Sequence, residues 1–318
     1  MTIIYSKAPG KIILFGEHAV VYGQPAIAIP VTKVKATARV YPELEKSPGW
    51  IGIQASDINL NTNLSNLPNN HPISQAILLT LQAMNPNHVP AMRIQISSTI
   101  PIGGGLGSSA AISIAIIRAL SAFLGQPLSS GEISDLAYEV EKIHHGTPSG
   151  IDNTVIAYQT PIYFQRERPI ELLKISNPSY WVIADTGETT PTRETVAAVR
   201  VQYQADPEQV MECLESIGTI TEEARSVLEN GDIQSLGSLL TENQGLLREL
   251  DLSSPKIEAL IAVALDAGAV GAKLSGGGRG GNIIALTHKD TQASISAALQ
   301  EAGATRVIVT RLAESEEN

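Results

Sequence analysis

The chain has 318 residues, of which 43% are hydrophobic and 17% charged, and its formal net charge is −10. This length and apolar content suffice for a large core and for two domains of ordinary size. The acidic balance argues against a broad nucleic-acid surface or a polybasic membrane contact. Cys213 is the single cysteine, which excludes an intrachain disulfide and a cysteine-rich metal site and suits a reducing compartment. No basic-then-apolar leader precedes the first strand, so we expect a soluble, cytoplasmic protein.

Periodicity predicts an α+β organisation for the first part of the chain. Residues 91–97 give the clearest strand, because Met92, Ile94 and Ile96 alternate with polar residues. The Asn/Pro-rich stretch 59–72 is interpreted as an exposed loop. The remaining predicted strands of this part are 3–8, 11–15, 26–41, 161–165, 170–175 and 181–185, and its predicted helices are 72–84, 108–124, 130–144 and 149–157.

From about residue 192 the pattern becomes mainly helical. This change predicts two domains, at residues 1–185 and 186–318, and the last residues of the second, 314–318, are interpreted as a frayed tail. The helices predicted for the second domain are 194–204, 207–229, 232–250, 255–267 and 290–302, and its strands are 270–275, 281–287 and 305–311.

The stretch 101–111, Pro-Ile-Gly-Gly-Gly-Leu-Gly-Ser-Ser-Ala-Ala, joins the strand at 91–97 to a long apolar helix. Glycines at positive φ let backbone N–H groups approach an anion, and a helix N-terminus directs its dipole at the same place. Ser108 and Ser109 could cap that helix, and one of them could ligate Mg²⁺. A flexible loop before a capped helix is the alternative, since the Gly-Lys-Ser/Thr ending of a Walker A loop is lacking. The predicted phosphate-binding residues are Pro101, Gly103, Gly104, Gly105, Leu106, Gly107, Ser108, Ser109 and Ala110.

Three motifs together resemble the GHMP small-molecule kinases. Residues 8–23, Ala-Pro-Gly-Lys-Ile-Ile-Leu-Phe-Gly-Glu-His-Ala-Val-Val-Tyr-Gly, are similar to the first signature of that superfamily in the form found in mevalonate kinases. The loop at 101–111 is similar to the second signature, and residues 273–281 are similar to the third. The resemblance implies a two-domain GHMP kinase fold, with an N-terminal ribosomal-protein-S5-like domain, a C-terminal ferredoxin-like helical and β domain, and an active site in the interdomain cleft. It also implies a homodimer.

The activity that the resemblance implies is transfer of a phosphoryl group from ATP to mevalonate, with Mg²⁺, giving 5-phosphomevalonate for isoprenoid biosynthesis. Relatives that act on phosphomevalonate, homoserine or a sugar share the glycine loop. Galactokinases typically carry Glu-His-Thr-Asp where this chain has Glu-His-Ala-Val at 17–20. The non-enzymatic alternative is a ligand sensor built on a silenced kinase. Such a protein should have lost Lys11, Glu141 or Asp152, and all three are present.

The resemblance assigns the chemistry to a few side chains. Asp152 matches the catalytic aspartate, placed to accept the proton of the attacking hydroxyl or to orient Lys11, which would act on the same hydroxyl. Ser108 and Glu141 match the magnesium ligands. On local sequence alone, Asp152 and Glu141 could equally be helix charges, and a lone lysine is usually solvated.

The predicted acceptor pocket comprises Glu17, His18, Thr192 and Gly277, together with Lys11 and Asp152. The resemblance implies that His18 binds a carboxylate and that Glu17 holds Lys11 in place. The third motif departs from the usual pattern, because Gly277 stands where alanine is common and Arg279 is inserted among the glycines. Arg279 could meet a phosphate or face solvent.

Overall fold

The computed structural model describes residues 3–101, 103–145 and 148–312. The chain forms two compact units that interleave along the sequence. Unit 1 is Met1–Lys11, Val34–Ile102 and Leu106–Gln159, and unit 2 is Ile12–Lys33, Gly103–Gly105 and Thr160–Asn318. Strands β1 (Ile4–Phe15) and β2 (Ala26–Pro42) therefore contribute residues to both units. The predicted boundary at residues 185 and 186 stays a prediction.

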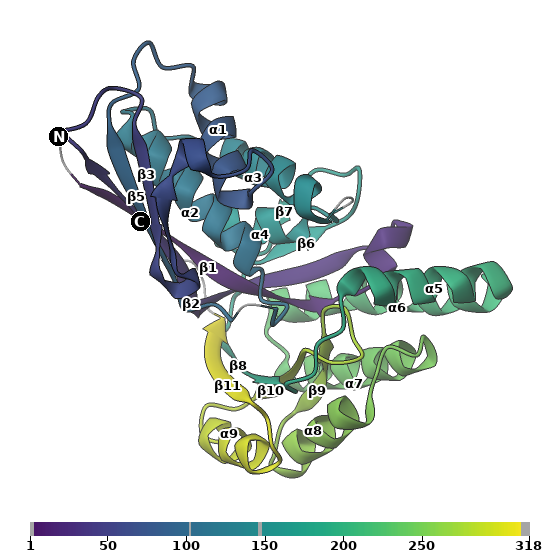
Figure 1. Ribbon diagram of the computed structural model, residues 1–318. Helices are drawn as coiled ribbons and strands as arrows, with labels where there is room; N and C mark the ends of the chain where they lie inside the picture. Colours follow the sequence, from purple (N-terminus) through teal and green to yellow (C-terminus); the bar gives the residue numbers. More distant parts are fainter. Residues whose placement is uncertain (1–2, 102, 146–147, 313–318) are drawn as a thin grey trace. The chain divides into compact units, whose positions relative to one another are not determined.

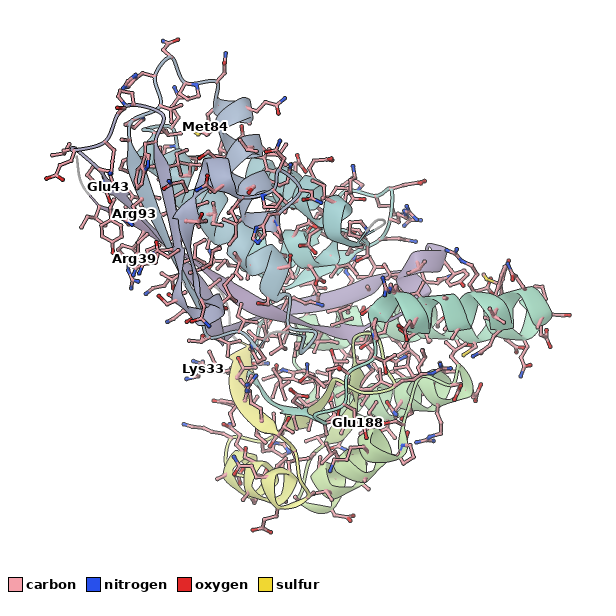
Figure 2. The ribbon with its side chains drawn as sticks, in the orientation of Figure 1. Lys33, Arg39, Glu43, Met84, Arg93 and Glu188 are labelled. Atoms are coloured by element: carbon pink, nitrogen blue, oxygen red, sulfur yellow. The ribbon has the colours of Figure 1, made fainter. Side chains whose placement is uncertain are left out.

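The sheet of unit 1 contains the later part of β2 and three shorter strands, which belong to a seven-stranded sheet in which β1 also pairs with β2. Its order is β4 (Leu60–Asn63), β3 (Ile51–Ala55), β5 (Met92–Ser98) and β2. β3 pairs parallel to β5, whereas β4 pairs antiparallel to β3, and β5 antiparallel to β2. The alternation predicted for β5 is confirmed, with Met92, Ile94 and Ile96 buried. Glu43 and Arg93 form an ion pair of 2.6 Å beside the ends of β2 and β5 (Figure 2).

Four α-helices lie in the described part of unit 1 and are labelled in Figure 1. Helix α2 owes its burial to an almost continuous run of alanine and isoleucine, and the other three are amphipathic or short. Their bounds are α1 (Pro72–Met84), α2 (Ser108–Phe123), α3 (Ser130–His145) and α4 (Ile151–Tyr158). Helices α2, α3 and α4 pack on one another, which fixes the elements that carry the predicted phosphate, metal and catalytic residues.

Unit 2 contains an antiparallel four-stranded sheet in the order β11 (Arg306–Leu312), β8 (Ser179–Asp185), β10 (Asn282–Thr287) and β9 (Gly271–Ser275). Its core joins the apolar residues of these strands to those of the helices. In the same unit, the first residues of β2 pair with β6 (Ile162–Phe164), which pairs with β7 (Glu171–Leu172).

Three of the five α-helices described in unit 2 begin at a capping side chain. Asp206, Asp232 and Ser254 each accept a hydrogen bond from a backbone N–H of the first turn that follows. Helices α8 and α9 pack against the strands of the sheet, and α7 packs against β9 (Figure 1). The bounds are α5 (Thr192–Ala205), α6 (Pro207–Asn230), α7 (Ile233–Glu249), α8 (Pro255–Asp266) and α9 (Gln292–Glu301).

Most predicted elements are confirmed to within a few residues, and the exceptions are short strands. The predicted strands 3–8 and 11–15 form one strand, β1, and the strand predicted at 170–175 is limited to β7. The interpretation of 59–72 as a loop is wrong at its start, because β4 pairs there with β3, a strand that the sequence analysis did not predict. Backbone pairing, rather than β propensity, makes a strand of the Leu-Asn-Thr-Asn sequence. The predicted tail at 314–318 lies outside the described residues. Among the described residues, no helix is long and apolar enough to cross a membrane.

Helix α7 offers a matched pair of glycines for testing its packing on β9. A Cβ added at Gly237 would lie 2.4 Å from the Val270 carbonyl oxygen, whereas one added at Gly245 meets nothing within 4 Å. Gly237→Ala should destabilise the protein by about 2–3 kcal/mol through overpacking against backbone. Gly245→Ala should stabilise it by about 0.5–1 kcal/mol through helix propensity. Urea unfolding of both variants measures the difference, and equal effects would contradict the packing described for α7.

Candidate active site

The glycine loop ends on the first turn of α2. Gly103, Gly105 and Gly107 have φ values of 75°, 69° and 73°, a region that side chains rarely adopt. Gly107 is the N-cap of α2 and makes no side-chain cap, so the expectation that Ser108 or Ser109 caps the helix is wrong. No side-chain cap therefore occupies the N-terminus of α2, an arrangement that suits the binding of an anion. The phosphate role of this loop stays a prediction.

The other predicted loop residues support this backbone. Leu106 and Ala110 are buried, and Pro101 and Ser108 are half-buried. The Asn282 side-chain amide donates to the carbonyl of Gly104 within unit 2. These residues fix the path of the loop.

Lys11 and Asp152 form an ion pair inside unit 1. The distance from Lys11 Nζ to Asp152 Oδ1 is 2.9 Å, with the Lys11 side chain 7% exposed and that of Asp152 33% exposed. The backbone N–H of Lys11 donates to the carbonyl of Leu106 at 3.0 Å, which joins β1 to the glycine loop. A Cβ at Gly107 would lie 3.0 Å from Lys11 Cγ, so glycine also allows the lysine to pass the helix N-terminus closely. The predicted catalytic pair therefore lies beside the phosphate loop.

Hydrogen bonds from Asn153 and from Arg118 position α4, which carries Asp152 in its first turn. The Asn153 side chain donates to the carbonyl and to the hydroxyl of Ser134 on α3, at 3.1 and 2.9 Å. The Arg118 guanidinium, on α2, donates to the carbonyls of Lys7 and Ala157 at 2.9 and 2.8 Å. Arg118 therefore ties β1, which carries Lys11, to α4. The sequence analysis assigned no role to Arg118, and a cation within an apolar helical run was the available signal.

Glu141 is paired with Ser109. The Ser109 hydroxyl donates to Glu141 Oε1 at 2.6 Å, and the Glu141 side chain is buried. The sequence analysis assigned Ser108 as the partner of Glu141 in a metal site. Adjacent residues on a helix point about 100° apart, so only one of the two serines can face α3. The structure gives that orientation to Ser109.

The predicted acceptor residues of unit 2 also lie together. His18 Nε2 lies 2.9 Å from the carbonyl oxygen of Gly277, and Thr192 Oγ1 lies 3.0 Å from where a Cβ of Gly277 would be. Glu17 forms a completely buried ion pair with Lys273. The expectation that Glu17 holds Lys11 is therefore wrong, since Lys11 pairs with Asp152. The sequence analysis had quoted Lys273 only as the start of a motif. Its partner could not be found from sequence, because the two residues are 256 positions apart.

His18 is neutral at physiological pH. Burial lowers the pKa of His18 from 6.5 to about 4, the bond to Gly277 opposes this shift, and the charge of Arg279 adds to it. A carbonyl oxygen only accepts, so Nε2 carries the proton and Nδ1 is the acceptor of the ring. This state argues against charge pairing between His18 and a carboxylate.

Arg279 anchors the third glycine motif to the residues after α7. Its backbone N–H donates to the Leu252 carbonyl at 2.6 Å, and its guanidinium pairs with the Asp251 carboxylate, also at 2.6 Å. Arg279 itself has φ 54°. The sequence alternatives for Arg279 were a phosphate or solvent, and the structure gives it a carboxylate partner. Gly278 is needed beside it, because a Cβ there would lie 2.4 Å from the Leu252 oxygen.

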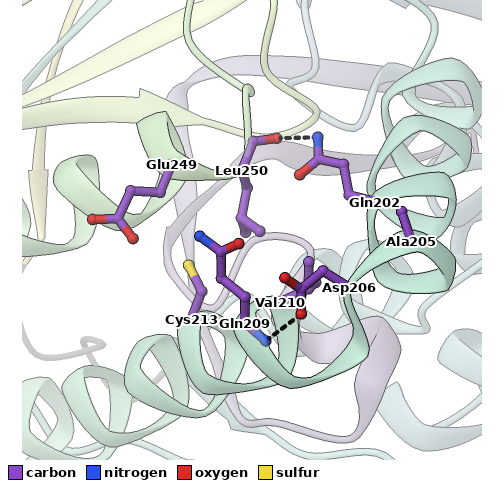
Figure 3. A pocket seen from close by; sticks show the side chains of 8 residues that line it. All are labelled: Gln202, Ala205, Asp206, Gln209, Val210, Cys213, Glu249 and Leu250. Atoms are coloured by element: carbon purple, nitrogen blue, oxygen red, sulfur yellow. Dashed lines mark hydrogen bonds between the residues drawn. The ribbon is translucent and has the colours of Figure 1, made fainter.

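A cavity of about 240 Å³ lies elsewhere in unit 2. Figure 3 shows its lining side chains, which come from the α5–α6 junction and the end of α7. None of the predicted site residues lines it, and burial raises the pKa of its Cys213 thiol to about 11. This cavity is therefore not the candidate active site, and its thiol is not a nucleophile at neutral pH.

Comparisons with known proteins agree with the motifs. The chain matches the family model "GHMP kinases N terminal domain" at residues 71–160 and "GHMP kinases C terminal" at residues 224–305. With these domains, the chain belongs to the GHMP kinases.

Proteins that the chain resembles include several mevalonate kinases. The chain is 36% identical over 321 residues to the mevalonate kinase of Pyrococcus furiosus, covering 96% of this chain and 95% of the relative. It is 35% identical over 292 residues to that of Aeropyrum pernix, covering 88% and 87%. The crystal structure of the Methanococcus jannaschii mevalonate kinase matches with a TM-score of 0.85 and 30% identity, covering 98% of each chain. That of L. major in complex with R-mevalonate matches with a TM-score of 0.83 and 28% identity, covering 98% and 97%. The family within the GHMP kinases is that of the mevalonate kinases.

The neutral state of His18 predicts a specific pH dependence of stability. Between pH 6.5 and about 4 the unfolded chain takes up a proton on His18 that the folded chain does not. Stability should therefore fall as the pH drops through this window, by up to about 3 kcal/mol from this residue. Urea unfolding at about pH 7.5 and pH 4.5 should show a smaller loss in His18→Gln than in the wild type. Equal losses in the two proteins would contradict the buried neutral state.

Proposed function

We propose that this chain transfers the γ-phosphoryl group of ATP to the primary hydroxyl of mevalonate, giving 5-phosphomevalonate. The observation that carries this proposal is the Lys11–Asp152 pair, 2.9 Å apart, beside a glycine loop that ends on a helix N-terminus. Such a loop suits the phosphates of a nucleotide, and such a pair suits a hydroxyl nucleophile. The mevalonate kinase names of the curated relatives supply the acceptor.

The chain's own residues account for the steps. The backbone of the glycine loop and the first turn of α2 hold the phosphates in place. Lys11 Nζ stabilises negative charge on the hydroxyl oxygen and on the phosphoryl group as it transfers. Asp152 keeps Lys11 in position and accepts the hydroxyl proton, either as transfer begins or as it ends. Positioning and electrostatics supply most of the acceleration in this class of reaction.

Ser109 and Glu141 fit a magnesium ion. Both are hard oxygen donors, they face each other at 2.6 Å, and Ser109 lies on the first turn of α2. Magnesium at proteins is commonly held by one or two carboxylates, with phosphates and waters completing the shell. When bound, the ion would neutralise charge on the phosphates. We therefore assign the metal role to Ser109 and Glu141, in place of Ser108 and Glu141.

Recognition of the acceptor is assigned to His18, Thr192 and Gly277. His18 is neutral and its Nε2–H donates a hydrogen bond to the Gly277 carbonyl. Its Nδ1 can therefore only accept, which suits a hydroxyl group better than a carboxylate. Mevalonate has a tertiary hydroxyl besides the primary one. We assign His18 to that tertiary hydroxyl. The homodimer and the cytoplasmic location stay predictions.

The substrate assignment is tested by measuring ADP release with purified protein and Mg²⁺-ATP. Mevalonate, phosphomevalonate, homoserine and galactose serve as acceptors in separate reactions. We expect turnover with mevalonate at least about 100-fold above the others, because hydrogen-bonding groups in a site reject acceptors that leave them unpaired. Faster turnover of another acceptor would overturn the assignment of mevalonate as substrate. No turnover with any acceptor, despite ATP binding, would favour the alternative of a ligand sensor built on a silenced kinase.

The two adjacent serines provide a matched test of the metal site. Ser109→Ala should raise the Mg²⁺ concentration for half-maximal activity by about 10- to 100-fold, because it removes an oxygen that faces Glu141. Ser108→Ala should change that concentration by less than about threefold, since Ser108 points away from Glu141. A titration of activity against Mg²⁺ at fixed ATP measures both. The reverse ranking would restore Ser108 as the ligand.

A further inference from the structure

Lys273 is a buried cation that the steps described above do not use. It lies on β9, and its side chain and that of Glu17 are both 0% exposed. Its Nζ donates to the Glu17 carboxylate and, at 2.7 Å, to the carbonyl of Leu274. Burial lowers the pKa of Lys273, and the Glu17 carboxylate opposes that shift.

An ion pair in this environment is an inefficient way to stabilise a fold. Removing two charges from water carries a penalty that their attraction only partly offsets, and apolar side chains of similar size are often equally stable or more stable. The pair therefore calls for an explanation other than stability.

Glu17 belongs to a segment whose backbone is held in unusual conformations. Gly16 has φ 91°, and a Cβ there would lie 2.3 Å from the carbonyl oxygen of Pro25. His18, directly after Glu17, has φ 61°, which is uncommon for a residue with a side chain. Such conformations persist only where the surroundings determine them strongly. Glu17, fixed at its carboxylate, lies between the two.

The strand that carries Lys273 leads to the group that His18 binds. The Ser275 hydroxyl donates to the Ile13 carbonyl at 2.8 Å and accepts from the Ile13 N–H at 3.2 Å. Two residues further on, the Gly277 carbonyl oxygen accepts a hydrogen bond from His18 Nε2–H. Three side-chain bridges within unit 2 thus join residues 13–18 to residues 273–277, and the Lys273–Glu17 pair is the middle one.

We propose that Lys273 is a positioning residue for recognition of the acceptor: through Glu17 it fixes the His18 backbone, and so the aim of the His18 ring at Gly277 and at the acceptor hydroxyl. Lys273 touches neither substrate in this account. The inference rests on the proposed function, because it assigns Lys273 to the acceptor half of the same reaction. It predicts a change in the KM for the acceptor and not in the KM for ATP, since the phosphates are assigned to the glycine loop and α2.

The decisive variant neutralises both members of the pair with side chains of similar size, Glu17→Gln together with Lys273→Met. Lys273→Met alone would leave a buried carboxylate without its cation and is expected to lose stability. The double variant should unfold within a few degrees of the wild type. Its KM for mevalonate should rise about 10- to 100-fold, as expected for a misplaced binding group. Its KM for ATP should change less than about twofold, because the residues assigned to ATP binding are unchanged.

Controls separate this role from a general structural one. Arg225→Met removes the cation of another ion pair of unit 2, Arg225–Glu171, and should leave both KM values unchanged. A double variant with the wild-type KM for mevalonate would overturn the inference, as would a parallel rise in both KM values.

If the double variant does not fold, Lys273→Arg decides. It keeps the charge but replaces a compact ammonium by a planar fork, which should raise the mevalonate KM selectively. An unchanged KM in that variant would overturn the inference. Failure of the wild type to phosphorylate mevalonate would instead sink the proposed function, so the two failures are distinguishable.

Discussion

The ion pair between Lys11 and Asp152 is the interaction around which unit 1 is organised. It requires β1 to pass the start of α2 closely, which the glycine at 107 permits, and it requires the first turn of α4 to face β1. Arg118 meets the second requirement from within α2, by donating to carbonyls of both elements. The packing of α2 and α4 with β1 therefore keeps Lys11 Nζ 2.9 Å from Asp152 Oδ1. A small displacement of either element would separate the charge from the nucleophile, and transfer depends steeply on such positioning.

The polar groups of the site in unit 2 are also paired, and its histidine carries no charge. There the histidine is neutral, its proton is given to a backbone carbonyl, and the one completely buried cation among the described residues is matched to a carboxylate. Even the arginine in the third glycine motif is paired with an aspartate. In unit 1, Lys11 is likewise paired with a carboxylate, and the N-terminus of α2, where we propose that phosphate binds, adds the positive end of the helix dipole. The acceptor residues offer hydrogen bonds of fixed direction, which discriminate well against molecules that lack the matching group.

Sequence patterns predicted the long elements and the proximity of Lys11 and Asp152, for physical reasons that also explain the failures. Long amphipathic or apolar stretches such as α2 and α6 carry enough periodicity to define a helix without help from tertiary structure. β3 and β4 are too short for that, and pairing with β5 and with each other determines them. The motifs placed Lys11 and Asp152, but the choice between Ser108 and Ser109 depends on the rotation of α2 against α3. The Glu17–Lys273 pair joins residues at opposite ends of the chain, so no local pattern could reveal it.

The central claim is that Asp152 acts on the reacting hydroxyl and does not merely help to bind substrates. Single-turnover phosphoryl transfer by Asp152→Asn, measured beside equilibrium binding of ATP and mevalonate, tests it most directly. Asparagine has the same shape but cannot accept the proton. Dissociation constants should stay within about threefold of the wild type, while transfer slows by about 10²- to 10⁴-fold. Transfer at the wild-type rate, or a loss explained wholly by weaker binding, would contradict the account.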